Sequence, residues 1–422
     1  MRRRVAGNLL WMLTERGLQV VTGIAIVAML ARALGPEGFA HFQYAQAVVT
    51  IAASVALICG SEVVVPRLVA DPASAAQHRL LAHAFMLRAF GGLLGYALMC
   101  GYLAVAGAAP EVWAVALLLG IAILLREPFG VVGAWMQAHT NNRPATVFSL
   151  ISLTIKAGMV GLLFTAGSRA APAFASAFAV EAVVLALLLA GYYLSRVPHR
   201  RIAVDSALAG QLLRGGTLFW ASFMMMMAAR RVDQLILQPL VPLADFGAYA
   251  ATMQILDNYA AAATIIAAGA APVYVYGQAD AALARRNVGL LALLLGVVGF
   301  AGAAVIAGTA DWIIHLLYGE QFGTAIGLLR VAAFATALLF VDVGLTLLPV
   351  YLRKPEWVAL KWAGTLAIIL VFDLIAVPRH GIWGAVGGYA LANGFAVVIG
   401  LALWWRCRTA RPVQTTMAAH ER

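Results

Sequence analysis

The 422-residue chain is 63% hydrophobic and 11% charged, with a mean hydropathy of +0.89. One water-soluble core cannot bury that much apolar surface, so the composition excludes a water-soluble protein and predicts an integral membrane protein. A net charge of +11 would suit a nucleic-acid partner in a soluble domain. Here the basic residues stand mostly in short gaps between apolar runs, which indicates membrane topology, and no nucleic-acid partner is expected.

The apolar runs predict an all-α polytopic membrane protein. Arg2 to Arg4 and the apolar run after them resemble a signal peptide, but the run from Val5 to Leu34 is too long and is interrupted by Glu15, which favours a retained first helix. The runs are continuous and lack period-two alternation, so helices are favoured over a barrel. A membrane helix needs about 20 apolar residues, which gives about twelve transmembrane helices. The predicted spans are 8–33, 39–64, 80–107, 111–135, 145–166, 172–195, 216–239, 246–275, 288–309, 324–350, 357–377 and 382–405.

An internal repeat divides these spans into two halves. Phe39, in a Gly/Pro/acid turn, corresponds to Phe246 in a similar turn about 206 residues later. The pairs Pro66 and Pro272, and Arg79 and Arg285, follow at the same offset. Each half has an even number of spans, so a pseudo-two-fold axis along the membrane normal relates the two six-helix lobes. The predicted organisation is a lobe at 1–195, a cytoplasmic linker at 196–214, a lobe at 215–406 and a cytoplasmic tail at 407–422.

The gaps between spans predict the orientation. One set of gaps is rich in arginine and lysine, whereas the opposite set holds only Arg169 and Arg379, with Arg32 close to a helix end. By the positive-inside rule both termini are cytoplasmic. The basic residues of the rich set are Arg2, Arg3, Arg4, Arg67, Arg79, Arg143, Arg196, Arg200, Arg201, Arg285, Arg286, Arg353, Lys354, Arg406, Arg408 and Arg411.

Many basic residues also fall inside the predicted spans. A charge in hydrocarbon costs about 3 to more than 10 kcal/mol, so such a residue normally faces a cavity or a partner. Arginine presents a planar fork suited to phosphate and carboxylate, and together these residues predict a cationic cavity for an anionic solute. Pro128 would kink the fourth span and open its backbone to that cavity. The candidate substrate-binding residues are Arg16, Arg88, Arg126, Lys156, Arg230, Arg231 and Arg330.

The acidic residues inside the spans are candidates for ion coupling. An acid beside an arginine that is alternately free and occupied by phosphate would bind and release a proton as the substrate exchanges. Sodium coupling through the same carboxylates stays open. The candidates are Glu15, Glu127, Asp233, Asp257 and Asp342.

Structural roles are the alternative for each of these charges. Arg230 and Asp233 have the i,i+3 spacing of a pair on one helix face. Glu62 can reach the headgroups, and Glu181 and Asp373 can approach the outer interface.

No enzyme or cofactor site is predicted. The cysteines and histidines are scattered without ligand spacing, and the methionine run at 224–227 points around a helix, which favours packing or lipid contact over metal binding. No nucleotide-binding loop is present, so the energy source is expected to be a proton or sodium gradient or the removal of product downstream. Glycine spacings at Gly91 and Gly95, and at Gly384 and Gly388, are typical of close helix packing.

Five segments resemble the polysaccharide biosynthesis proteins, the O-antigen flippase family of the MOP (MATE-like) superfamily. They are LARALGPEGF at 30–39, RVD at 231–233, FGAY at 246–249, LYGEQF at 317–322 and GIWGA at 381–385. The resemblance implies two six-helix lobes around a cationic central cavity, alternating access, and a bacterial inner-membrane protein. The implied substrate is an undecaprenyl-diphosphate-linked oligosaccharide, an O-antigen or exopolysaccharide repeat unit. Other implied partners are membrane lipids and polysaccharide assembly proteins, and twelve spans lack the two extra helices of the peptidoglycan-precursor flippase.

Two other functions stay open at this stage. A MATE-type proton- or sodium-coupled exporter of cationic small molecules would have an acidic cavity. A membrane enzyme of polysaccharide assembly, such as a polymerase, would carry a large periplasmic loop, and no gap in the sequence is long enough for one. A structural scaffold of an assembly complex is a weaker third alternative.

Overall fold

The computed structural model describes residues 2–71, 73–197 and 205–407, with side chains from residue 17 onward. All regular elements in this part of the chain are helical. The first half contains α1 (Arg2–Ala56), α2 (Ser61–Ala70), α3 (Ser74–Val105), α4 (Pro110–Ala138), α5 (Arg143–Thr165) and α6 (Ala171–Leu194). The second half contains α7 (Ser206–Ala229), α8 (Val232–Leu237), α9 (Leu243–Ala271), η1 (Pro272–Tyr276), α10 (Ala281–Gly308), α11 (Ala310–Leu317), η2 (Glu320–Phe322), α12 (Thr324–Tyr351), α13 (Pro355–His380) and α14 (Ile382–Arg406).

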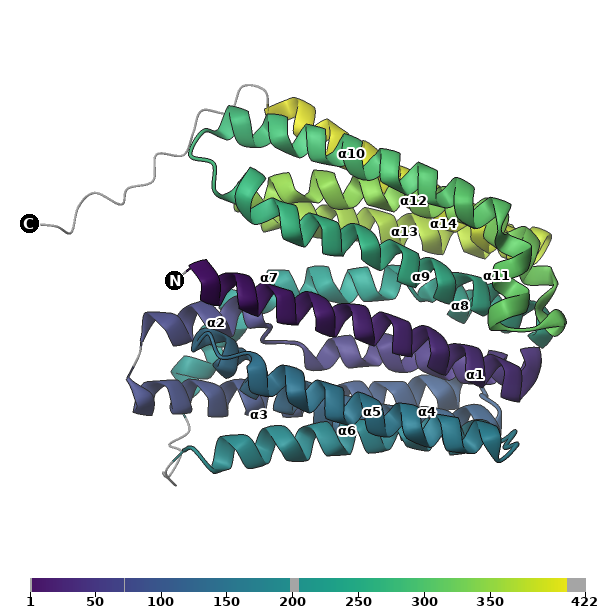
Figure 1. The fold of residues 1–422 in the computed structure, drawn as a ribbon, viewed down its shortest axis with the longest axis horizontal. Coiled ribbons are helices and arrows are strands. Elements are labelled where there is room, and N and C mark those ends of the chain that lie inside the picture. Colours follow the sequence, from purple (N-terminus) through teal and green to yellow (C-terminus); the bar gives the residue numbers. More distant parts are fainter. Residues whose placement is uncertain (1, 72, 198–204, 408–422) are drawn as a thin grey trace, which may run out of the picture.

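Helix α1 crosses the membrane twice. Its 55 residues would extend about 83 Å as one rod, far more than the roughly 30 Å hydrocarbon core. Gly35 interrupts it with φ 67° and ψ 177°, a backbone conformation that glycine adopts without a steric penalty. Figure 1 shows the chain reversing direction there. Among the described residues, 11 helical stretches are long and apolar enough to cross a membrane, and the two arms of α1 bring the crossings to the predicted twelve. The predicted all-helical membrane fold is confirmed.

Proline and glycine set many of the other helix ends. Proline stands in the first turn of α4, α5, α6 and α13, where no intrahelical N–H bond is lost. Glycines with positive φ follow or separate helices at Gly107, Gly167, Gly319 and Gly381. These residues keep the turns short, so neighbouring helices lie side by side.

Two of the predicted spans are broken in the structure. The second span was expected to run from 39 to 64, but α1 ends at Ala56 and the chain resumes as α2 after a break at 57–60. Pro66, which was expected at the exit from that span, lies inside α2. The seventh span was expected at 216–239, but α7 begins at Ser206, where Asp205 caps the helix, and a break at 230–231 separates it from α8. Hydropathy does not reveal either break because the polar residues at each break, Ser61-Glu62 and Arg230-Arg231, are few and lie within a longer apolar run.

The helices form two groups that meet at one end. Helices α1 to α6 pack on one another, and most of the remaining helices pack together, with α7 against α13 as well as α1, α2 and α3. Figure 1 shows the groups close together at the end that holds the Gly35 turn, α8 and α11, and diverging toward the opposite end. We call these the closed end and the open end. We propose that the two groups are the two lobes of the sequence repeat. The predicted 196–214 linker and 407–422 tail lie largely outside the described residues or at their edge.

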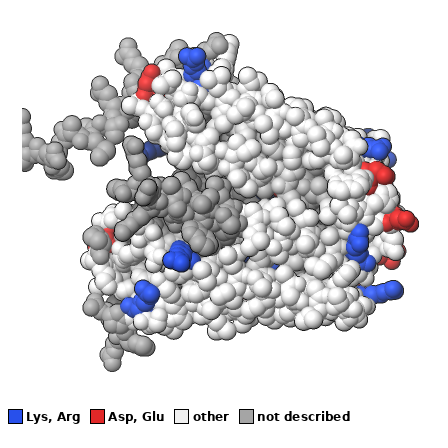
Figure 2. Space-filling view, viewed as in Figure 1, with Lys and Arg blue, Asp and Glu red and all other residues white. Residues whose placement is uncertain are grey.

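The surface has the charge distribution of a membrane protein. On the face shown in Figure 2, charged side chains gather toward the two ends, and a largely uncharged band separates them. Many large apolar residues of the transmembrane helices are exposed, among them Phe90, Leu293 and Val371. Lipid tails cover such residues without the penalty that water would impose.

Small residues bring helix backbones into direct contact, as the glycine spacings predicted. A Cβ atom added at Gly91 would lie 2.8 Å from the Val55 carbonyl oxygen, and one added at Gly95 would collide with the Ala52 carbonyl. Gly384 packs in the same way against the backbone at Ala376. Close approach of backbones at small residues is the usual source of helix association in lipid.

We expect Gly95→Val to lower the stability of the protein by roughly 1–3 kcal/mol, since the added side chain must push α3 away from α1. The measurement is the thermal unfolding midpoint of the detergent-purified protein. Gly101→Val on the same helix is the matched control because no atom lies within 4 Å of its added Cβ. Equal midpoints for the two variants would contradict this packing.

Candidate functional site

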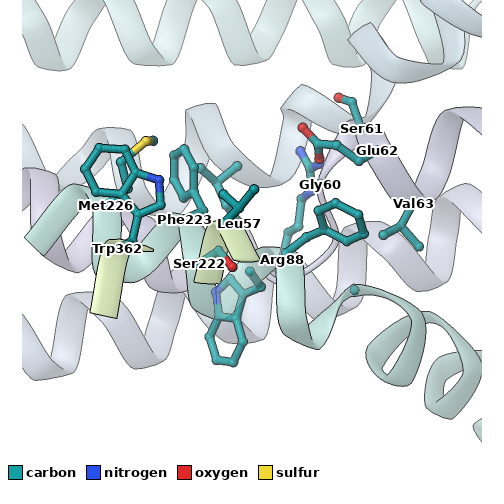
Figure 3. Close-up of a pocket in the computed structure, with 14 residues that line it drawn as sticks. Leu57, Gly60, Ser61, Glu62, Val63, Arg88, Ser222, Phe223, Met226 and Trp362 are labelled. Atoms are coloured by element: carbon teal, nitrogen blue, oxygen red, sulfur yellow. The ribbon is translucent and has the colours of Figure 1, made fainter. Parts of the chain in front are cut away.

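Two adjoining cavities lie between the helix groups. The first has a volume of ≈ 330 Å³ and is lined by the break after α1, by α2 and α3, and by α7 and α13 across from them. Figure 3 shows Glu62 and Arg88 near one another on one side, with Met226 and Trp362 on the other. The cavity therefore has a charged wall and an apolar wall.

The second cavity continues from the first. Its volume is ≈ 290 Å³, and Leu57 and Phe223 line both cavities. Helices α1, α4 and α6 supply most of its wall and α7 supplies the rest. The charged side chains in this wall are Arg126, Glu127 and Glu181. Together the two cavities form the candidate substrate site.

Arg88 is buried and fixes the broken second span. Its side chain is 3% exposed, and Nε donates to the Cys59 carbonyl at 2.8 Å while Nη1 donates to the Glu127 carbonyl at 3.3 Å. A broken helix leaves carbonyls without partners, and these would be costly inside a membrane. Arg88 lies at the edge of the first cavity, but its hydrogen bonds go to backbone carbonyls in the break after α1 and in α4. Its role is therefore to stabilise the backbone there.

Arg126 and Lys156 differ in how they meet the second cavity. Arg126 is exposed to it, and among the described side chains it forms no ion pair. Lys156 of α5 donates to Glu181 of α6 at 2.8 Å, and each side chain is 13% exposed. Glu181 therefore lies in the cavity wall, away from the outer interface where the sequence suggested it.

Arg230 and Arg231 occupy the break between α7 and α8. Arg231 donates to Asp257 of α9 at 2.6 Å, and Arg230 lies 4.0 Å from the same carboxylate with 37% of its side chain exposed. The i,i+3 pair of Arg230 with Asp233 does not form, because the helix ends between them. Asp257, a predicted coupling acid, is thus held by the two arginines.

A buried polar cluster lies among α8, α9, α13 and α14. Asp233 accepts a hydrogen bond from the Tyr249 hydroxyl, and both residues are at most 4% exposed. Asp373 is fully buried, and neither of its carboxylate oxygens has a partner among the described residues. Asp373 interacts electrostatically with Asp233, and its carboxylate lies against Gly388 of α14. We call Asp233, Tyr249 and Asp373 the C-terminal polar cluster.

The remaining predicted coupling acid, Asp342, belongs to a sealed ion pair. Lys361 of α13 donates to its two oxygens at 2.9 and 2.8 Å, and the two side chains are 6% and 7% exposed. Lys361 stands 205 positions after Lys156, close to the repeat offset, and both lysines pair with an acid on a neighbouring helix. The difference is that the Lys156 pair reaches the second substrate cavity through Glu181, whereas Lys361 lines only a small hollow of ≈ 10 Å³.

The other predicted residues lie elsewhere. Arg330 is exposed on α12 and lines neither cavity. The side chains of Glu15 and Arg16 lie outside the described residues. The described walls of the two cavities carry mixed charge, three acids with two arginines, and are thus less basic than the cationic cavity that the sequence predicted.

The apolar wall was not predicted as part of the site. Phe223 and Met226 of α7 line the first cavity, and Met227 lines the second. Methionine side chains are flexible and adapt to ligands of irregular shape. The run of four methionines was the available signal, but the sequence does not say that α7 lies between the two helix groups.

The closed end is held by contacts between the two helix groups. Arg32 of α1 donates to three successive carbonyls at the end of α11, to His315 at 3.2 Å, Leu316 at 2.7 Å and Leu317 at 3.2 Å. Helix ends attract cations through these free carbonyls. Beside this contact the Phe39 ring packs against Tyr318 and Phe322, and Gly247 abuts the Pro36 carbonyl.

These features define the class of the protein: a multi-pass membrane protein with the fold of the MOP-superfamily transporters. An inward-facing multidrug resistance MATE family transporter of that superfamily has a TM-score of 0.74 at 15% identity, over 92% of this chain and 94% of the other. The lipid II flippase MurJ, in an inward closed conformation, has a TM-score of 0.65 at 12% sequence identity, and the match covers 93% of this chain and 87% of the other. A MOP superfamily transporter from Pyrococcus furiosus is described as having a binding pocket of reverse polarity. It has a TM-score of 0.65 at 16% sequence identity, and the match covers 96% of each chain.

A comparison of the sequence with protein families assigns the chain to a narrower group than the fold does. The family model described as polysaccharide biosynthesis protein matches residues 29–327, and the chain belongs to this family. No curated protein matches the chain. The family resemblance found in the sequence is therefore confirmed, together with the MATE-like fold.

We expect Arg32→Ala to loosen the closed end, since the α11 carbonyls lose a charged donor worth roughly 1.5–3 kcal/mol per bond at most. Spin labels at Glu37 and Glu320, with the three native cysteines replaced by alanine, report the separation of the two groups by pulsed electron resonance. The long-distance population should rise about tenfold or more. Arg169→Ala removes the same charge from the same end and should leave the distances unchanged. An unaltered distribution in Arg32→Ala would show that this contact does not hold the end closed.

Proposed function

We propose that this protein is a flippase for a lipid-linked anionic oligosaccharide, of the undecaprenyl-diphosphate type, in a bacterial inner membrane. Membership of the polysaccharide biosynthesis family supports the glycan, and the likeness to a lipid II flippase supports the lipid carrier. The positive-inside distribution places both termini in the cytoplasm, so the open end faces the cytoplasm and the closed end the periplasm. The protein acts as a transporter and not as an enzyme.

The observation that carries this proposal is Arg126. It is exposed to a cavity between the two helix groups and forms no ion pair among the described side chains, although its charge also acts on the adjacent Glu127. An unpaired arginine fork is suited to bind a diphosphate. The Lys156–Glu181 pair lies in the adjoining wall, and a bound phosphate would compete with Glu181 for the lysine. The Phe223 and Met227 wall opposite would contact the first isoprene units or the sugar.

Transport by this site requires alternating access. With the substrate in the cavity, the closed end must open and the open end must close. The Arg32 contact and the aromatic cluster around Phe39 would then separate. Binding must stay moderate in both states, because a ligand that strongly favours one state would trap the carrier in it.

We expect Arg126→Gln to reduce flipping about tenfold, since a charge-assisted bond to the diphosphate is replaced by a neutral one. The assay follows undecaprenyl-diphosphate-linked oligosaccharide in proteoliposomes by its accessibility to an added glycosidase. Arg330→Gln is the matched control because it also removes an exposed arginine from a span but lies outside both cavities. Wild-type flux in a folded Arg126→Gln protein would overturn the substrate site.

Ion coupling is the second part of the proposal, and we assign it to the C-terminal polar cluster. Asp233 and Asp373 are buried and interact electrostatically, and among the described residues neither forms an ion pair with a lysine or arginine. The charge of Arg231 also acts on Asp233, but this arginine is paired with Asp257. Two neighbouring buried carboxylates with so little counter-charge are costly unless a proton or a sodium ion accompanies them. Among the other candidates, Asp257 and Asp342 are already paired with basic side chains.

We expect Asp373→Asn to abolish the response of flipping to an imposed ion gradient while leaving slow exchange down the substrate gradient intact. The same proteoliposomes are tested with an outward or inward gradient of protons, and then of sodium. Asp311→Asn, an exposed acid at the closed end, serves as the control. A gradient response equal to wild type in Asp373→Asn would exclude this cluster from coupling.

A cation exporter of the MATE type is the second candidate. Glu62, Glu127 and Glu181 line the cavities, and these acids favour a cationic small molecule more than the sequence suggested. Raised resistance to cationic drugs on overexpression, without any effect on lipid-linked sugar, would favour this function over the flippase.

A further inference from the structure

A third hollow lies on the outside of the second helix group. It is a groove of ≈ 950 Å³, lined by α10, α12 and α14, at the upper end of the roughly 300–1,000 Å³ that is usual for ligand sites. Helix α12 packs against both α10 and α14 and forms the floor through Val341 and Leu345. Small residues such as Gly296 on α10 keep the groove open where a larger side chain would press on Val341.

The groove is long enough to hold an acyl chain of one leaflet. Its lining runs along α10 from Ala282 to Phe300, about 27 Å of helix. Half of the hydrocarbon core is roughly 15 Å thick, so a lipid chain that enters beside Arg285 would fit within the length of the groove. Leu293 and Val297, which are 66% and 61% exposed, form the apolar rim on α10.

Two arginines stand at one end of this apolar surface. Arg285 is held against Trp404, with its guanidinium 4.8 Å from the ring centroid and Nη1 donating to the Trp404 carbonyl at 3.4 Å. Arg286 beside it is exposed. Among the described residues no acid lines the groove, and Asp280 nearby in sequence is engaged in capping α10 at Ala282.

The groove is separate from the substrate cavities. It shares no lining residue with either of them, and in Figure 1 α10 lies on the side of its group remote from α1 to α6. A substrate held at Arg126 therefore does not account for it. The occupant has to be apolar along its length and anionic at the arginine end, which is the chemistry of a phospholipid with an acidic headgroup.

We propose that this groove is a binding site for an anionic phospholipid of the leaflet at the open end, with its headgroup at Arg285 and Arg286 and an acyl chain along α10. Basic pockets between membrane helices on the cytoplasmic side commonly hold anionic headgroups. The bound lipid bridges α10 and α14 over α12 and stabilises the second helix group during transport.

The test is photo-crosslinking with phosphatidylglycerol and phosphatidylcholine that carry the same diazirine acyl chain, each at equal mole fraction in vesicles with the full-length protein. Phosphatidylglycerol should label the peptides around residues 289–300 and 401–404 in clear excess over phosphatidylcholine. Arg285→Gln with Arg286→Gln should reduce that excess by about fivefold for each arginine. Equal labelling by the two lipids in the wild type would mean ordinary boundary lipid and would overturn the proposal.

Two further variants test whether the lipid preference depends on these two arginines in particular and whether it depends on the apolar groove. Arg353→Gln with Lys354→Gln removes two charges from the turn between α12 and α13, outside the groove, and should keep the wild-type preference. Val297→Trp keeps both arginines but fills the groove, and it should reduce labelling by phosphatidylglycerol. If the paired arginine variant does not fold, Arg286→Gln alone, at an exposed position, gives the same test. Unchanged labelling in both Arg286→Gln and Val297→Trp would also refute the site.

Discussion

Every polar group inside the hydrocarbon region needs a partner from the protein, and this requirement governs both the breaks in the helices and the placement of their charges. Arg88 supplies the partner for the carbonyls at the break in the second span. Asp257 pairs with Arg231 and lies 4.0 Å from Arg230 at the break in the seventh span. Lys361 and Asp342 neutralise each other within the second helix group. Most of the embedded charge in the described part of the chain is therefore committed to holding the fold.

The polar groups that this pairing leaves over are the ones on which the proposed function rests. Arg126 faces the inter-group cavity, and the C-terminal polar cluster around Asp373 retains buried carboxylate oxygens without partners. One is a cation available to an anion, and the other is a pair of acids available to a proton or a metal cation. They lie in different helix groups, so substrate and coupling ion would meet the protein at separate places and communicate through the motion of one group against the other.

Much of the fold could be predicted from the sequence because membrane crossing depends on length and hydropathy, which are local properties. The twelve spans follow from that, and the Gly35 turn and the glycine contacts follow from equally local glycine and proline patterns. The breaks at 57–60 and 230–231 could not be predicted, since each depends on a partner brought from a distant helix. The position of a charge along a span gives its depth but not the direction in which it points. Arg126 and Arg330 look alike in the sequence, yet only Arg126 lies in a cavity. The buried pair partner Lys361 was missed for the same reason.

The two lysines related by the repeat show how a duplicated scaffold can acquire unequal halves. Lys156 and Lys361 each form an ion pair with an acid on a neighbouring helix. The first pair reaches the second substrate cavity through Glu181, whereas both side chains of the second pair are buried. A sealed pair resists change, because exchanging either member leaves a bare charge in a dry interior. An accessible pair can be altered at smaller cost, since water or a ligand can take the place of the missing partner. The first helix group is thus the half in which new substrate preferences can arise by single substitutions, while the second preserves the architecture.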